Sequence, residues 1–292
     1  MARSSLKIDL MGQSAESQQQ RTRTLQLLCH MPPFPALGAQ AFSIAATADD
    51  NVDSLVNTFR SDPALTADLL RIANSAEFGM QRRIGGIQHA IVLLGMERVR
   101  SLILTVVMDS YLRHFPKRQD AHPVWAHSVA AAVIAEALAG VWRTDPGRAY
   151  TAGLMHELGR LGLLLSVRER YVEISRVAFE NIDSATRLEK SIFGVTHCEA
   201  GAFLGRRWGF PEELCDCMSL HHEAVTPSVG PLVSLTQLSC KVATALGFRE
   251  VAVRHQLDPA EILPATVRDH PQAEPEQLRQ LVTKRLASVS AA

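Results

Sequence analysis

The sequence predicts an all-α protein, and three observations support this fold class. Aromatic residues make up only 5% of the 292 residues, whereas Ala and Leu are abundant. Apolar residues recur at helical spacing rather than in the alternating pattern of strands. Helix start and stop signals also flank several of these apolar segments. Because 47% of the residues are apolar, the chain can bury a large core.

The first half of the chain predicts a bundle of five helices. The clearest lies in SDPALTADLLRIANSAEFG, where Asp62 is a good N-cap, Pro63 suits the first helical position and Gly79 ends the segment. Its apolar stripe consists of Leu65, Leu69, Ile72 and Ala73. MPPFPALGAQAFSIAA and DDNVDSLVNTFR predict two helices before it. GGIQHAIVLLG and MERVRSLILTVVMDSYLRHF predict two more after it, separated at Gly95.

The apolar pattern lapses in HFPKRQDAHP, residues 114–123, which concentrates charge and two prolines and is the predicted subdomain boundary. Beyond it, residues 124–142 predict an Ala-rich helix, and TDPGRAY begins another that runs into TAGLMHELGRLGLLLS. Further helices are predicted at about 168–180, 184–193, 196–208, 211–221 and 231–246. The predicted domains are a polar, initially disordered lead-in at 1–24, helical subdomains at 25–116 and 120–255, and a tail at 256–292 with a final helix and a frayed end.

Composition excludes several classes of function. Thirty basic and thirty acidic residues cancel, so we expect no DNA partner and no attachment to anionic lipid. The beginning of the chain lacks the apolar segment of a signal peptide, and apolar runs such as SLILTVVM are far below the roughly 18–20 residues that cross a bilayer. The odd number of cysteines without a CxxC pair predicts reduced thiols and a cytoplasmic location: Cys29, Cys198, Cys215, Cys217 and Cys240.

Histidines in the second half are the candidate site residues. Those on predicted helices or at their ends are His127, His156, His197, His221 and His222, with Glu157 beside His156. Neutral imidazole and carboxylate suit a divalent transition metal, although a single histidine is more often a hydrogen-bonded structural residue. The metalloprotease pattern HExxH is excluded because HELGR has Arg160 at the second histidine position. Cys215 and Cys217 are a weak ligand pair, since residues two apart on a helix point to different sides.

Short basic runs offer a second candidate feature. Arg82-Arg83, Arg98, Arg100 and Arg206-Arg207 could form an anion-binding surface, for instance for a cyclic dinucleotide or an acidic partner. The neutral net charge favours the simpler interpretation that they are solvated helix faces. The sequence contains no P-loop, no dinucleotide fingerprint and no GxSxG elbow.

Several stretches in a fixed order resemble the HD-related output domain family, HDOD, of bacterial signalling proteins, over roughly residues 25–255. They are DPALTADLLRIANSAEFG, RIGGIQHAIVLLGMERVRSL, VWAHSVAAAVIAEALA, YTAGLMHELGRLGLLL, THCEAGAFLGRRWGFPEEL and SLHHE. The resemblance implies an N-terminal helical bundle packed on an HD-like helical subdomain, here residues 120–255, that is related to the HD phosphohydrolases.

The resemblance also implies a set of metal ligands. By position, His127 resembles the first histidine of HD phosphohydrolases, His156 and Glu157 the His-Asp pair, and His197 with the doublet His221–His222 the additional ligands of the HD-GYP branch. The acids differ: glutamate replaces the aspartate of the pair, and the closing aspartate falls near Cys240. Glutamate is one methylene longer, and a misplacement of about 1 Å can cost on the order of 100-fold in rate. A thiol would favour zinc over magnesium or manganese.

Three interpretations of the histidines stay open: hydrogen-bonded polar groups in an inactive fold, a bound but non-catalytic metal, and a hydrolytic centre. The favoured function is a non-catalytic module of signal transduction that contacts other signalling proteins and needs no cofactor. No receiver, kinase or cyclase domain is fused to it, so we expect its input from another molecule. The alternative is a metal-dependent phosphohydrolase acting on a nucleotide or cyclic dinucleotide, with a divalent metal such as Zn, Mn or Fe.

Overall fold

The computed structural model describes residues 2–36, 62–75, 78–79, 83–115, 118–224, 229–254, 258–268 and 270–290, together with Gly38. Secondary structure in these residues is helical apart from one isolated β-bridge between Phe179 and Val253. The predicted all-α fold class is therefore confirmed. None of the described helices is both long enough and apolar enough to cross a membrane.

The N-terminal bundle contains α4 (Pro63–Ala73), α5 (Ile87–Leu94) and α6 (Met96–Arg113). The carboxylate of Asp62 caps α4 by accepting a hydrogen bond from the Leu65 amide at 3.0 Å. Gly95 has a φ of 84° and makes the turn between α5 and α6, as its position between the two apolar segments predicts. The helix predicted at 49–60 lies outside the described residues, as does most of the one predicted at 31–46.

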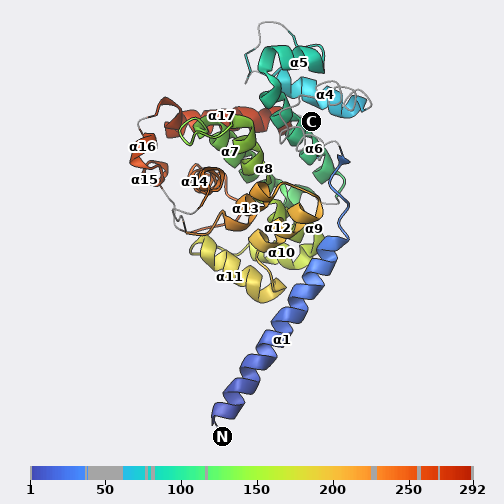
Figure 1. Cartoon of the computed structure of the whole chain (residues 1–292), viewed down its shortest axis with the longest axis vertical. Helices are drawn as coiled ribbons and strands as arrows, with labels where there is room; N and C mark the ends of the chain where they lie inside the picture. The colour runs from blue at the N-terminus through green and yellow to red at the C-terminus, as the bar shows by residue number, and fades with distance from the viewer. Residues whose placement is uncertain are drawn as a thin grey trace.

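The second half of the chain forms a set of packed helices around the central α7 (His122–Leu138). They are α8 (Pro146–Met155), α9 (Leu158–Ser166), α10 (Arg168–Ser175), α11 (Ile182–Phe193), α12 (His197–Arg207), α13 (Glu212–Leu220) and α14 (Pro231–Ala245). The alanines of α7 let α8 approach closely: a Cβ on Gly153 would lie 2.6 Å from the Cα of Ala132. In Figure 1, α7 and α8 lie between α4–α6 at one end and α10–α11 at the other.

One predicted helix is two helices in the structure. The segment from TDPGRAY through TAGLMHELGRLGLLLS breaks between α8 and α9, at His156 and Glu157. At the break the imidazole of His156 hydrogen-bonds to the carbonyl of Gly153 in place of solvent. The break turns both candidate ligands toward the interior, where neither has solvent exposure.

The N-terminal segment forms the first helix of the structure. Residues Ala2–Cys29 form one helix, α1, that projects from the body (Figure 1) and includes most of the lead-in predicted at 1–24. The segment contains no proline. Its C-terminal half packs on α9, α11 and α12, and Leu28 there is buried. Arg21 also pairs with Glu199 of α12 at 2.9 Å.

The C-terminal tail packs on the body. It contains α15 (Pro259–Ile262), α16 (Ala265–Arg268) and the final helix α17 (Pro275–Ser290), which packs on α7. Val289 near the end of α17 is buried, and residues 291–292 at the end predicted to fray lie outside the described residues. Its apolar side chains Leu278, Val282 and Val289 face the core. The tail therefore belongs to the packed molecule.

Candidate metal centre

The structure brings the predicted site residues together in the interior of the second half. His127 comes from α7, His156 and Glu157 from the break between α8 and α9, His197 from the first position of α12, and His221 and His222 from the residues directly after α13. His127, His156, Glu157, His197 and His221 have no solvent exposure. All of the residues proposed from the resemblance thus share one cluster.

Local structure fixes where α12 starts and hence where His197 lies. Thr196 and Glu199 form a capping box in which the Thr196 hydroxyl accepts from the Glu199 amide and the Glu199 carboxylate accepts from the Thr196 amide. The backbone of Gly159 in α9 lies directly against α12, since a Cβ there would be 1.9 Å from the His197 carbonyl oxygen. The two helices therefore hold His197 and Glu157 at a fixed separation.

The Nδ1 atoms of the buried histidines are anchored, which leaves each Nε2 facing the centre. Since a carbonyl oxygen only accepts, Nδ1 must carry the proton in three of them. The Nδ1–O distances are 2.7 Å from His127 to Phe248, 2.6 Å from His156 to Gly153 and 2.8 Å from His221 to Met218. The Nδ1 of His197 lies 2.6 Å from a carboxylate oxygen of Glu189. This is the arrangement of histidines that ligate a metal through Nε2.

The inward-facing nitrogens meet in two pairs. Nε2 of His127 lies 3.2 Å from Nε2 of His156, and Nε2 of His197 lies 3.2 Å from Nε2 of His221. Two neutral imidazoles protonated on Nδ1 would point lone pairs at each other, so each pair favours a shared cation or proton. Burial and the neighbouring His221 lower the pKa of His156 well below its usual range. The imidazole of His156 is therefore neutral in the folded protein.

Glu157 lies between the two pairs. One of its oxygens, Oε1, has no hydrogen-bond partner in the described part of the chain, although the side chain is fully buried. This oxygen lies 3.9 Å from Nε2 of His156, 3.9 Å from Nε2 of His197 and 3.7 Å from Nε2 of His221. An unpartnered buried carboxylate oxygen is costly, and a cation among these nitrogens would satisfy it.

Two groups of donor atoms could each hold an ion, and Glu157 belongs to both. The first consists of His127, His156, Glu157 and Cys240, and the second of Glu157, His197, His221 and His222. Within each group the donor atoms lie within 4.8 Å of one another. The thiol of Cys240 stands where the resemblance places the closing acid, so the first group combines nitrogen, oxygen and sulfur donors that suit zinc.

Arg160 changes the character of the second group. Its guanidinium is fully buried and donates to Glu157 Oε2 at 2.7 Å, to the Tyr171 hydroxyl at 2.9 Å and to Glu189 Oε1 at 3.0 Å. Its Nη2 also lies 3.1 Å from Nε2 of His197. The guanidinium therefore already supplies a positive charge to the carboxylates and a donor to one imidazole of this group.

The electrostatics follow from that buried charge. Burial alone would raise the pKa of Glu157, but the Arg160 guanidinium and His197 outweigh it and hold that pKa well below its usual range. Burial likewise opposes ionisation of Glu189, whereas His197 and Arg160 lower its pKa to about 2. Both carboxylates are ionised in the folded protein, and the guanidinium balances part of their charge.

Other neighbours of the site carry no local signal in the sequence. Glu189 lies on the amphipathic helix α11 and resembles any charged residue of its exposed face, yet it is buried against His197. Glu250 follows α14 and places Oε2 3.1 Å from Nδ1 of His127. Only Cys198 had an available signal, its position next to His197 in the sequence; its Sγ lies 3.5 Å from Nε2 of His197.

A cavity of about 620 Å³ borders the cluster at His222, Cys240 and Glu250. Its other charged lining residues are Glu180, Asp183, Glu223 and Lys241. Acidic groups thus outnumber the single lysine among the described residues of this wall. Such a wall attracts cations and repels phosphate anions.

The remaining sequence candidates lie away from the cluster. Cys215 and Cys217 are buried on α13 and belong to neither group of donors. None of the cysteines forms a disulfide. Of the residues in the basic runs, Arg100 pairs with Glu97, Arg206 pairs with Glu212 and Arg207 donates to the carbonyl of Cys29. Arg83 and Arg98 are exposed, and Arg82 lies outside the described residues.

The helical fold with an inward-facing cluster of histidines and one carboxylate defines an HD-type protein. The chain belongs to the HDOD domain family, whose sequence profile matches residues 31–224. A protein of Treponema pallidum (strain Nichols) is 25% identical over 194 residues, which cover 66% of this chain and 37% of that protein. The chain thus accounts for little more than a third of that curated relative's length.

Solved crystal structures share the fold. An HDOD domain protein from Geobacter sulfurreducens superimposes with a TM-score of 0.70 at 22% identity, covering 92% of this chain and 95% of that one. A candidate phosphohydrolase from Shewanella amazonensis SB2B gives 0.71 at 21% identity, with 91% and 97% covered. A candidate signal transduction protein from Marinobacter aquaeolei VT8 gives 0.68 at 20% identity, with 95% and 65% covered.

Proposed function

We propose that this protein is a non-catalytic regulatory module of bacterial signal transduction that acts through contacts with other signalling proteins in the cytoplasm. The observation that carries the proposal is the place of Arg160. A hydrolytic centre must leave room beside its carboxylates for a reacting water and a phosphate oxygen. Here the buried guanidinium binds Glu157, Glu189 and His197 instead.

Access to the cluster supports the same conclusion. The central ligand candidates have no solvent exposure, and the adjoining cavity presents mainly acidic side chains. A phosphodiester carries negative charge, so this wall opposes its approach. Hydrolysis would require both a displaced guanidinium and a substrate that overcomes the acidic wall.

Metal retention is compatible with this role. His127, His156, Glu157 and Cys240 would hold a single ion, and their N, O and S donors fit zinc better than magnesium. Bound there, zinc would act as a Lewis acid and as a cross-link between α7, α9 and α14. The carbonyl groups of Phe248 and Gly153 orient the imidazoles of His127 and His156, and the surrounding buried residues exclude water.

A specific observation also favours a second candidate function, a metal-dependent phosphohydrolase acting on a nucleotide or cyclic dinucleotide. The unpartnered Oε1 of Glu157 between two pairs of imidazoles is what a bridging carboxylate of a two-ion centre would present. In that candidate, Arg160 would have to leave His197 when the second ion binds.

Turnover measurements distinguish the two functions. The protein, purified without a histidine tag, is assayed for hydrolysis of bis(p-nitrophenyl) phosphate and of cyclic dinucleotides, with Mn²⁺, Fe²⁺ or Zn²⁺ added. We expect no turnover above that of the ion alone. Elemental analysis is expected to find at most one zinc per chain, lost in His127→Ala and in His156→Ala. The control His114→Ala, which removes an exposed histidine of the α6 terminus, should leave metal content unchanged.

Two results would decide against the regulatory role. Turnover that is lost in His156→Ala but kept in His114→Ala would assign hydrolysis to the cluster. Two ions per chain together with turnover would favour the bridging role of Glu157. If instead no metal binds and no turnover occurs, the regulatory module stands and the histidines are structural.

A further inference from the structure

A second cavity, of about 710 Å³, lies where the N-terminal bundle meets α7, α8 and α17, and none of its described lining residues belongs to the histidine cluster. Leu94 comes from α5, Arg98 from α6, Val133 and Glu136 from α7, and Leu281 and Arg285 from α17. Phe78, Gln272 and Glu97 also line it. Its volume is within the range of small-molecule sites, about 300–1,000 Å³.

Arg285 is a fixed cationic group in this cavity. Its side chain is 4% exposed, and its guanidinium carbon lies 5.4 Å from the centre of the Phe78 ring and 5.1 Å from that of Tyr150. Contacts with two rings hold the planar group in place before any ligand arrives. Its Nη2 lies 3.6 Å from Glu136 Oε2, which is longer than a hydrogen bond.

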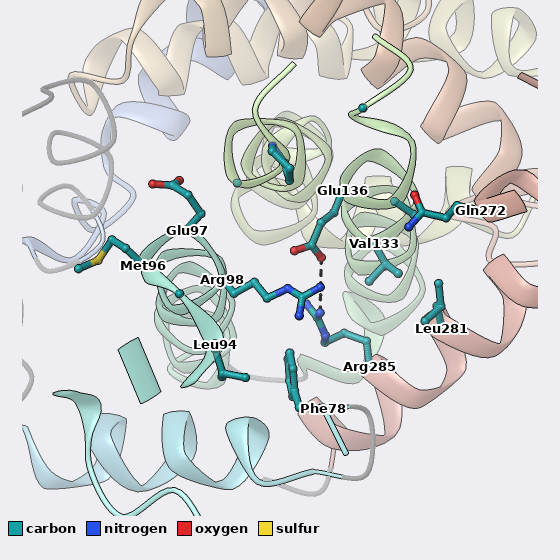
Figure 2. A pocket seen from close by; sticks show the side chains of 15 residues that line it. Phe78, Leu94, Met96, Glu97, Arg98, Val133, Glu136, Gln272, Leu281 and Arg285 are labelled. Atoms are coloured by element: carbon teal, nitrogen blue, oxygen red, sulfur yellow. Dashed lines mark ion pairs between the residues drawn. The ribbon is translucent and has the colours of Figure 1, made fainter. Parts of the chain in front are cut away.

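Arg98 adds a second guanidinium from the opposite wall. Figure 2 shows the side chains of Arg98 and Arg285 extending toward each other, with the Glu136 carboxylate beside them. Arg98 is exposed and forms no ion pair with any described residue. Two guanidinium groups that face one space repel each other unless an anion lies between them.

Two acids, Glu97 and Glu136, also line the cavity. Glu97 pairs with Arg100 and lies against the start of α8, since a Cβ on Gly147 would be 2.6 Å from its Oε2. Glu136 faces Arg285. In Figure 2 the Glu97 carboxylate points away from the Arg98 guanidinium. The first turn of α6, which has no side-chain cap, adds amide donors nearby.

We propose that this cavity binds a nucleoside monophosphate, with the phosphate held between Arg98 and Arg285 and the base against Phe78 and Leu94. A guanidinium matches the paired oxygens of a phosphate, and an aromatic ring accepts the face of any base. Glu136 and Gln272 can receive the sugar hydroxyls. Because its walls come from both halves of the chain and from α17, an occupied cavity links these elements and supplies the module with a small-molecule input.

Calorimetric titration of the full chain tests the proposal with 5′-GMP, 5′-AMP, guanosine and inorganic phosphate as probes. At least one nucleotide should bind saturably, with guanosine and inorganic phosphate each about 10-fold weaker or more, because each lacks one part of the recognised ligand. Saturable binding of neither nucleotide overturns the proposal. Inorganic phosphate that binds as tightly as the nucleotides overturns the role of the aromatic wall.

Two variants locate the binding. Arg98→Ala should weaken nucleotide binding by about 10- to 100-fold, the effect of losing a charged hydrogen-bonding partner. Gly140→Phe should abolish it, since Gly140 lines the cavity and a Cβ there meets only open space. The control Arg279→Ala, at an exposed position of α17 outside the cavity, should bind as the parent does.

Unchanged binding in both Arg98→Ala and Gly140→Phe would overturn the assignment to this cavity. The inference is independent of the proposed regulatory role: the binding readout needs neither metal nor turnover. Calorimetry shows whether the nucleotide binds, and the turnover assay shows whether the protein hydrolyses phosphodiesters. The two proposals can therefore fail separately.

Discussion

At the scale of single residues, Arg160 sets the properties of the centre. A buried guanidinium without partners would be strongly unfavourable, and here its donors reach two carboxylates, a phenol and an imidazole. The carboxylates in turn depend on it, because Glu157 and Glu189 are ionised in the interior. This mutual dependence makes the arginine a structural cation of the cluster.

Replacing Arg160 by the apolar Arg160→Met should destabilise the protein by about 3–5 kcal/mol, since it leaves two buried carboxylates without their cation. Urea unfolding followed by circular dichroism gives the free energy. The matched control is Arg187→Met on α11, an exposed arginine that hydrogen-bonds to Ser184, with an expected change within about 0.5 kcal/mol. A loss below about 1 kcal/mol in Arg160→Met would show that the carboxylates do not rely on the guanidinium.

Because the thiol of Cys217 is buried, we expect the free energy of unfolding to fall at alkaline pH. Burial raises its pKa to about 12, so between about pH 9 and 12 the unfolded chain has released a proton that the folded chain retains. The stabilising contribution is complete below pH 8 and falls by up to about 1.4 kcal/mol per pH unit above pH 9. The free-energy difference between the parent and Cys217→Ala should therefore shrink from pH 9 to 11. A constant difference would contradict the raised pKa.

At the scale of elements, the crossing of α9 and α12 determines the separation of the candidate ligands. Gly159 and Gly201 let the two backbones touch: a Cβ on Gly159 would lie 2.3 Å from the Gly201 amide nitrogen. Such a Cβ would also lie 1.9 Å from the His197 carbonyl oxygen. Because both atoms belong to the backbone, no side-chain rotation can relieve the contact. The glycines of GLMHELGRLGL therefore serve helix packing next to the ligands.

Gly159→Ala should destabilise the protein by about 3 kcal/mol or more, because the added methyl forces two packed helices apart. Thermal and urea unfolding measure the effect. The control Gly140→Ala adds the same methyl where a Cβ meets nothing within 4 Å, and it should be neutral or slightly stabilising. Equal stability of the two variants would contradict the close approach of α9 and α12.

Individual helices were predictable where the signals that define them are local. Asp62 with Pro63, Gly95 between two apolar runs, and Thr196 with Glu199 act within four residues of the chain. The break at His156 and Glu157 carries no such signal, since neither proline nor an N-cap residue marks it. Packing of α8 on α7 and of α9 on α12 decides it instead.

At the scale of the whole molecule, the clustering of the histidines was predictable because the sequence stretches that resemble the HDOD family occur in the order of that family. The partners that set their chemistry were not. Glu189 contacts Arg160 across 29 residues of sequence and Glu250 reaches His127 across the length of the second half. Such pairs depend on tertiary packing alone. The choice between the inactive and the metal-binding interpretation therefore depends on partners such as Glu189 and Glu250, which no local sequence pattern identifies.

The extent of the core leads to a last prediction, that the chain folds without metal. One contiguous apolar cluster runs from Leu28 of α1 to Val289 of α17. Because Arg160 already neutralises charge inside the centre, a metal adds stability without being required for folding. After dialysis against EDTA, we expect unchanged helical circular dichroism and cooperative thermal unfolding. Zinc at about 100 times its dissociation constant should then add about 2.7 kcal/mol, a rise in Tm on the order of 5 °C.

The rise in Tm should be absent from His127→Ala and His156→Ala and present in His114→Ala, because only the first two remove donors of the His127, His156, Glu157 and Cys240 group. Unfolding by EDTA alone would contradict the prediction. It would mean that the cluster depends on a metal for its charge balance, and that the Arg160 guanidinium stabilises only the half of the cluster that contains Glu189 and His197.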